Sequence, residues 1–213
     1  MEDKGKRRAT KNEKNPGERL RGMKIVRHQN SVSARMDLLV GIPKGTLIDI
    51  ETTGLDPMKH EIITVGSISG SRLSVIQRKV KDKKPFYREV KSALRRLPRP
   101  FYAYNSEFEE DFLKAQLGIR VKIKDLMRPW REMASHRAIK WPKLDELVSE
   151  PEMYFDTTRV SAKDIPSLWQ AYLGNGDEKL IELPLRHNRA DLLRELYLLV
   201  QYPHLYELEK EAE

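Results

Sequence analysis

Two acidic residues interrupt an apolar strand pattern, and they constrain the fold more than any other feature of the chain. Asp49 and Glu51 alternate with the apolar residues Leu47, Ile48 and Ile50. In an extended strand residues i and i+2 point to the same face, so the two carboxylates project together. Neighbouring carboxylates repel each other unless a cation lies between them. The segment therefore predicts a strand that carries a site for Mg²⁺ or Mn²⁺; the alternative is an edge strand whose acids face water.

The rest of the hydrophobic pattern predicts an α/β fold. Strands are expected near residues 46–51, 61–68 and 72–80, with a hairpin turn at Gly70 and Ser71 joining the last two into an antiparallel meander. Helical spacing then alternates with shorter strands, and a long apolar stripe predicts a final helix over 187–201. This order indicates a mixed sheet, antiparallel and then parallel, with helices on both faces.

The chain of 213 residues is long enough for one such domain with a sizeable core. Residues 1–20 have no hydrophobic periodicity and read as a basic flexible tail, and residues 21–44 form a lead-in whose apolar side chains can pack on the domain. The domain itself is expected over 45–205, followed by a charged end at 206–213.

The charge and the cysteine content of the chain limit the classes of partner and of functional site that are expected. Lys and Arg total 40 against 32 for Asp and Glu, a net charge of +8 that favours a polyanion such as nucleic acid. The chain has no cysteine, which excludes disulfides, thiolate zinc sites and cysteine nucleophiles and fits a reducing, cytoplasmic setting. No membrane span or secretory signal is recognisable, so no membrane partner is expected.

Two further acidic positions are expected near the first pair. Glu109 lies at the start of a predicted helix that follows a strand, and His187 and Asp191 are four residues apart, on one face of the last helix. All of them can face one cleft.

Three motifs therefore follow one another in the chain: DIETTGL at 49–55, NSEFEEDFL at 105–113 and HNRAD at 187–191. In order and spacing they resemble the motifs of the DEDD-type 3′-5′ exonucleases of the ribonuclease H-like superfamily, and most of all the YprB-like predicted exonucleases. The resemblance spans about residues 46–202. It departs from the family at Glu109, where Asp is usual, and at His187, which occupies the spacing of the tyrosine subgroup rather than the H-x₄-D of the histidine subgroup.

The resemblance implies a ribonuclease H-like fold and a two-metal mechanism. Four acids would hold two Mg²⁺ or Mn²⁺ ions, and His187 would position or deprotonate the attacking water. The four acids are Asp49, Glu51, Glu109 and Asp191. It also implies substrate contacts from Thr52 and Leu55 beside the terminal nucleotide, and from Asn105 and Phe108 along the strand path. A structural role is the alternative for each of these four.

The expected function is a metal-dependent 3′-5′ exonuclease acting on single-stranded or frayed DNA or RNA, in DNA repair or in RNA processing. One alternative is a nucleic-acid-binding module or nuclease subunit in which Glu109 accompanies weak or absent catalysis. Another is a structure-selective endonuclease on the same fold.

Overall fold

A long antiparallel ladder forms the centre of the molecule. The computed structural model describes residues 23–149 and 160–206, and in it β2 (Ser31–Thr52) pairs antiparallel with β3 (Ile62–Arg78) on one side. On its other side β2 pairs first with β1 (Lys24–Arg27), antiparallel, and then with β4 (Phe101–Ala103), parallel. β5 (Ile123–Asp125) continues the sheet parallel to β4. The described residues thus form a five-stranded mixed sheet, which confirms the predicted fold class.

The predicted hairpin at Gly70 and Ser71 is wrong, because β3 runs through these residues as one strand. β2 begins at Ser31, well before the predicted strand, so it can pair with both halves of β3. The ladder absorbs the change of register around Ile42. There Gly41 lies so close to the backbone of Gly70 that any side chain at residue 41 would overlap it, and Gly70 has a φ of +54°. The two glycines therefore permit an irregularity in a continuous ladder instead of a turn.

The residues of the predicted lead-in belong to this ladder. β1 and the first part of β2 occupy 24–27 and 31–44. The predicted tail at 1–20 lies outside the described residues, as does all but Tyr206 of the charged end at 206–213.

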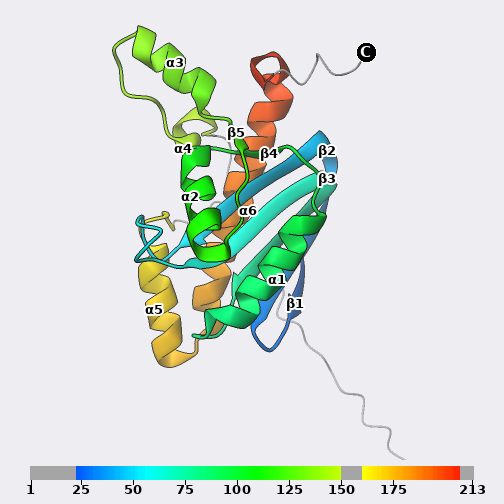
Figure 1. Cartoon of the computed structure of the whole chain (residues 1–213), viewed down its shortest axis with the longest axis vertical. Coiled ribbons are helices and arrows are strands. Elements are labelled where there is room, and N and C mark those ends of the chain that lie inside the picture. The colour runs from blue at the N-terminus through cyan, green and yellow to red at the C-terminus, as the bar shows by residue number, and fades with distance from the viewer. Residues whose placement is uncertain (1–22, 150–159, 207–213) are drawn as a thin grey trace, which may run out of the picture.

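Helices cover both faces of the sheet (Figure 1). On one face α1 (Lys83–Arg96) and α2 (Ser106–Leu117) pack on the apolar side chains of β2 that include Ile48 and Ile50. On the other face α5 (Ile165–Asn175) and α6 (Glu178–Gln201) pack on a second apolar cluster, which includes Leu47 and the buried Trp169. The strand pattern thus sorts its alternating residues into two cores.

The remaining helices complete one end of the molecule. α3 (Arg128–His136) and α4 (Leu144–Leu147) follow β5, and the short helix η2 (Pro203–Tyr206) follows α6. Figure 1 shows α3 projecting at this end, beyond α2 and α4.

Helix α6 is longer than the predicted 187–201. It begins at Glu178, where the carboxylate of Asp177 accepts the backbone N–H of Lys179 and caps the helix. Pro184 lies within it, buried, so the helix continues although one backbone N–H is missing. The extra turns extend the contact of α6 with α5.

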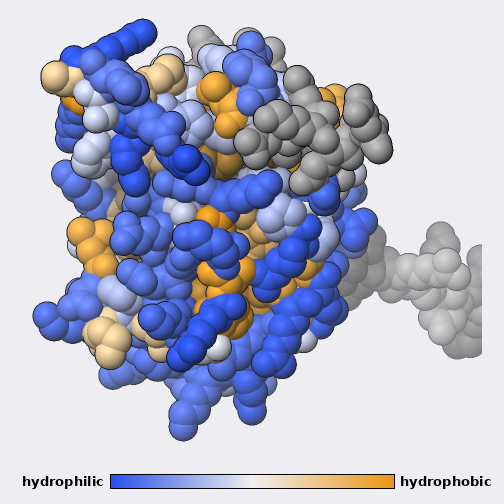
Figure 2. Space-filling model, turned by 45° about the horizontal axis from the view of Figure 1, so that its top comes forward, coloured by the Kyte–Doolittle hydropathy of each residue, from blue (hydrophilic) through white to orange (hydrophobic). Residues whose placement is uncertain are grey.

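The face of the molecule that Figure 2 shows is mainly hydrophilic. In the view of Figure 2 apolar side chains gather in limited areas between charged and polar ones. None of the helices in the described part of the chain combines the length and the apolar character that a bilayer crossing requires.

Candidate functional site

Strand β2 directs its two acids toward helix α6. Asp49 and Glu51 share the strand face of Leu47, which belongs to the α6 core, whereas Ile48 and Ile50 belong to the core on the opposite side. Asp49 is half-buried, and the side chain of Glu51 is buried. The acids therefore lie between the sheet and a helix rather than at a solvated edge.

Helix α6 approaches this strand pair at a glycine. Gly66 of β3 pairs with Asp49, and a side chain at Gly66 would overlap the amide of Asn188. The absence of that side chain lets Asn188 reach across β3 to β2. Its amide nitrogen Nδ2 donates to the Asp49 carboxylate at 2.6 Å and to the Asp49 backbone carbonyl at 3.0 Å.

The next polar residues of α6 surround a third carboxylate. His187 Nε2 lies 3.3 Å from Oδ2 of Asp191, and the guanidinium of Arg194 lies 2.6 Å from its Oδ1. Glu51, His187 and Asp191 offer ligand atoms that all lie within 4.8 Å of one another. Two carboxylates and one imidazole, from a strand and a helix, thus converge on a space suited to a divalent cation.

The fourth acid comes from α2. This helix starts directly after β4, where Asn105 adopts a left-handed conformation with φ of 67°. Asp125 at the end of β5 accepts the backbone N–H groups of Asn105 and Met127 and so fixes the start of α2. Glu109 lies in its first turn, 3% exposed, and its Oε2 is buried without a hydrogen-bond partner among the described residues.

Electrostatics link the four acids into one cluster. Loss of hydration raises the pKa of Asp49 well above its usual range, and the charges of Asp191 and Glu109 raise it further. The pKa of Glu51 is raised by burial and then by Asp49, Asp191 and Glu109. Burial also raises the pKa of Glu109, with a contribution from Asp125. Such mutual repulsion favours either protonated acids or a bound cation.

The sequence did not indicate a fifth acid, Glu195. This residue lies one turn after Asp191 on α6 and is 1% exposed. Burial raises its pKa well above the usual range, and the charges of Asp49, Glu109 and Asp191 raise it further. The sequence feature that could have indicated Glu195 is its position four residues after Asp191, within the apolar stripe of the helix. Asn188 and Arg194 were also missed as contacts of the site.

The residues expected to contact substrate occupy different settings. Leu55 is 83% exposed on the loop after β2, and the hydroxyl of Thr52 donates to the Gly54 carbonyl at 2.6 Å. The side-chain oxygen of Asn105 accepts from Arg131 at 3.4 Å. Phe108 packs on the core beneath α2, its ring centroid 4.8 Å from that of Phe112. Of the four, Leu55 is the one with a freely accessible side chain.

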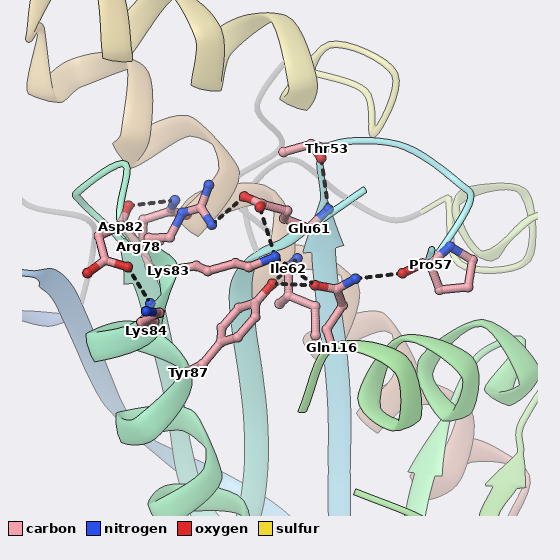
Figure 3. Close-up of polar contacts among 11 residues, drawn as sticks. Thr53, Pro57, Glu61, Ile62, Arg78, Asp82, Lys83, Lys84, Tyr87 and Gln116 are labelled. Atoms are coloured by element: carbon pink, nitrogen blue, oxygen red, sulfur yellow. Dashed lines mark hydrogen bonds and ion pairs between the residues drawn. The ribbon is translucent and has the colours of Figure 1, made fainter. Parts of the chain in front are cut away.

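A polar network holds the loop that carries Leu55 (Figure 3). The Gln116 amide of α2 donates to the Pro57 carbonyl at 2.6 Å, and its oxygen accepts from the Tyr87 hydroxyl of α1 at 3.0 Å. At the base of the loop, the backbone N–H of Glu61 donates to the Thr53 hydroxyl at 2.9 Å. The loop is therefore fixed to two helices beside the first acid pair.

The Glu61 side chain anchors the other end of this network. Its carboxylate pairs with the buried Arg78 at 2.8 Å and with Lys83 at 3.0 Å, as Figure 3 shows. The Arg78 guanidinium also lies over the Trp169 ring, 4.6 Å from its centroid. The network thus connects the loop to the core between the sheet and α5.

A cavity of about 590 Å³ opens beside His187 and Asp191. Three cationic residues, Lys143, Lys163 and Arg194, contribute to its walls. A negatively charged chain that enters this cavity would meet cations before it reaches the carboxylates.

The family follows from comparison of the whole domain with known proteins. The family model described as the RNase H superfamily matches residues 46–202. The chain belongs to the RNase H superfamily. An uncharacterised protein of Methanocaldococcus jannaschii is 29% identical to this RNase H superfamily member over 170 residues, which is 71% of this chain and 92% of the relative.

A solved structure described as the apo form of a nuclease is also similar. It is 16% identical, covers 80% of this RNase H superfamily chain and 88% of its own, and superposes with a TM-score of 0.37. This superposition is loose, so the assignment to the superfamily rests on the family match. The match confirms the superfamily that the three motifs predicted.

Proposed function

We propose that the protein is a metal-dependent 3′-5′ exonuclease of the DEDD type, similar to the YprB-like group, that hydrolyses single-stranded or frayed DNA or RNA. The observation that supports this proposal most is the convergence of carboxylates from β2, α2 and α6. The charges of Asp191 and Glu109 raise the pKa of Asp49, and the charges of Asp49, Asp191 and Glu109 raise the pKa of Glu51. Membership of the RNase H superfamily is consistent with nuclease chemistry on this scaffold.

The donor set fits Mg²⁺ or Mn²⁺. Carboxylate oxygens are the ligands that these hard cations prefer, and the buried Oε2 of Glu109 has no hydrogen-bond partner within residues 23–149 and 160–206. We assign cation binding to Asp49, Glu51, Glu109 and Asp191. Two divalent cations bound there would neutralise the carboxylates and polarise the water and phosphate oxygens of the reaction.

We assign the remaining roles, positioning of water, of Asp49 and of the substrate, to residues around the acid cluster. His187 lies 3.3 Å from Asp191, so its imidazole is held beside the acids, where it can position the attacking water and accept its proton. Asn188 orients Asp49 through two hydrogen bonds. Leu55, Thr52, Asn105 and Phe108 are proposed to contact the terminal nucleotides.

The cavity beside His187 supplies an approach for the nucleic acid. Lys143, Lys163 and Arg194 can neutralise phosphates, which gives affinity without sequence preference. We therefore expect the 3′ end of the strand to reach the acids along this cavity.

A second candidate function is supported by Arg194. Its guanidinium lies 2.6 Å from Asp191, so one oxygen of a proposed cation ligand already has a cationic partner. Together with Glu109 in place of the usual Asp, this contact fits a module that binds nucleic acid and cleaves it weakly or not at all.

Cleavage assays separate these functions. Single-stranded and duplex DNA and RNA, each labelled at the 5′ end, are incubated with Mg²⁺, with Mn²⁺ or with EDTA. An exonuclease produces a ladder that shortens stepwise from the 3′ end and requires the metal. Asp191→Asn should abolish the ladder but retain binding of the strand. No metal-dependent product on any of the substrates would contradict the enzymatic proposal.

A circular single strand provides the control for polarity. An exonuclease requires an end and leaves the circle intact, whereas an endonuclease linearises it. A phosphorothioate at the 3′-terminal linkage should slow a 3′-5′ enzyme, and the same group at the 5′ terminus should not.

A further inference from the structure

Glu195 is a buried carboxylate for which the four-acid site has no role. It lies on α6 one turn beyond Asp191 and is 1% exposed. Its Oε1 accepts the backbone N–H of Tyr104 at 2.8 Å. Its Oε2 is buried and has no hydrogen-bond partner in the part of the chain that the structure describes.

The hydrogen bond from Tyr104 to Glu195 links two elements that carry acids of the site. Tyr104 lies between the end of β4 at Ala103 and the start of α2 at Ser106, and the first turn of α2 carries Glu109. Glu195 therefore ties the helix that presents Asp191 to the junction that presents Glu109. This tie fixes the distance between two acids that come from remote parts of the chain.

The tie alone does not account for a carboxylate. A neutral amide would accept the same N–H without burying a charge among other acids, and a buried charge without a partner is costly. Among the described residues, Oε2 of Glu195 and Oε2 of Glu109 are both buried without a hydrogen-bond partner, and Glu195 follows Asp191 by one turn of the same helix. An acid in this setting is stabilised when a cation is bound.

We propose that Glu195 is a fifth carboxylate of the cation site, with Oε2 directed to the cation, directly or through a water molecule, and Oε1 holding Tyr104. This inference rests on the cation site of the proposed function. In this proposal Glu195 both binds the cation and positions the start of α2 through Tyr104. Helix α6 then carries two of the five acids, Asp191 and Glu195.

The decisive variant is Glu195→Gln, which keeps an acceptor for the Tyr104 N–H and removes the charge. Binding of Mn²⁺ is measured by isothermal titration calorimetry, and the melting temperature is measured in EDTA and with Mn²⁺. We expect the Mn²⁺ dissociation constant to rise about tenfold or more. The melting temperature in EDTA should stay the same or rise, because one buried negative charge is lost.

Two further variants separate charge from fold. Glu195→Asp retains the charge and should retain part of the Mn²⁺ affinity, even if the Gln variant folds poorly. Glu182→Gln is the matched control, because Glu182 lies on the same helix and pairs with Arg27 at 2.6 Å. It should leave Mn²⁺ binding unchanged.

The outcomes distinguish the two proposals. If wild type and Glu182→Gln bind Mn²⁺ and Glu195→Gln binds it equally well, Glu195 is only a structural tie and the inference is wrong. If wild type binds no Mn²⁺, the cation site of the proposed function fails, and the inference fails with it.

Discussion

Asn188 of α6 donates two hydrogen bonds from one amide nitrogen to Asp49 of β2, at 2.6 Å to the carboxylate and at 3.0 Å to the backbone carbonyl. The contact passes over Gly66, which has no side chain to obstruct it. One helix residue thus sets both the position of the strand and the orientation of its first acid.

Replacing Asn188 should uncouple α6 from β2. We expect Asn188→Ala to lower the free energy of unfolding by about 1 to 3 kcal/mol, because buried acceptors on Asp49 lose their donor. Asn188→Asp should destabilise the metal-free protein more, since it places another carboxylate beside Asp49. Urea denaturation in EDTA measures both effects, and Mn²⁺ should recover more stability in the Asp variant than in the Ala variant.

The metal-free protein should lose stability as the pH rises. Asp49, Glu51, Glu109 and Glu195 have folded-state pKa values raised above the ordinary 3.8 of Asp and 4.5 of Glu. Their protonated forms therefore favour the folded state at low pH, and this contribution is lost as the pH passes through the raised values. We expect the free energy of unfolding in EDTA to fall as the pH rises above the ordinary values of these carboxyl groups.

The fall in stability with rising pH can be traced to the acid cluster by two comparisons, one with a Glu51 variant and one with Mn²⁺. Glu61 and Glu178 have lowered pKa values, so their contribution is lost only at more acidic pH and does not oppose the trend. Glu51→Gln should flatten the pH dependence in EDTA, and Mn²⁺ should flatten it in wild type. An equally steep fall in the Gln variant would show that the acid cluster is not its source.

The cationic cavity should determine affinity for the nucleic acid. The test uses an Asp191→Asn background, which prevents cleavage. In it we expect Lys163→Glu to weaken binding of a single strand about 3- to 10-fold at low salt. The slope of log affinity against log salt concentration should fall by about one, which corresponds to one lost phosphate contact. The matched control is Lys84→Glu on α1, across the sheet from the cavity. Fluorescence anisotropy at several salt concentrations measures both; equal losses would indicate net charge rather than a defined path.

Gln116 should affect substrate binding through the loop that it holds. Gln116→Leu removes the hydrogen bonds to Pro57 and Tyr87, so we expect a loss of about 1 to 3 kcal/mol in stability and a rise in KM for the terminal nucleotides. Mn²⁺ affinity should be unchanged, because none of the acids is touched. Lys114→Ala, at an exposed position of the same helix, is the control, and an unaltered KM in the Leu variant would contradict the assignment.

The sequence predicted the parts of the fold that depend on local pattern. Asp49 and Glu51 share a strand face because side chains alternate in any strand, and His187 and Asp191 share a helix face because they are four residues apart. The mixed sheet with helices on both faces followed from the order of these patterns.

Features set by distant contacts could not be derived in the same way. The predicted turn at Gly70 is a continuous strand because β2 extends back to Ser31 and pairs with it. Glu195 was not singled out in the sequence, and its setting follows from its hydrogen bond to Tyr104 and from the charges of the other acids. The four proposed acid ligands and the proposed substrate contacts stay predictions until metal and nucleic acid binding are measured.

The contact between Asn188 and Asp49 joins residues that lie 139 positions apart in the chain. A nascent polypeptide on the ribosome holds the acids of β2 and α2 long before α6 has been synthesised. It therefore carries an incomplete cluster throughout most of translation. Contacts of such long sequence separation also form late in folding. A nuclease with the proposed activity would thus stay inert beside the messenger that encodes it until helix α6 docks.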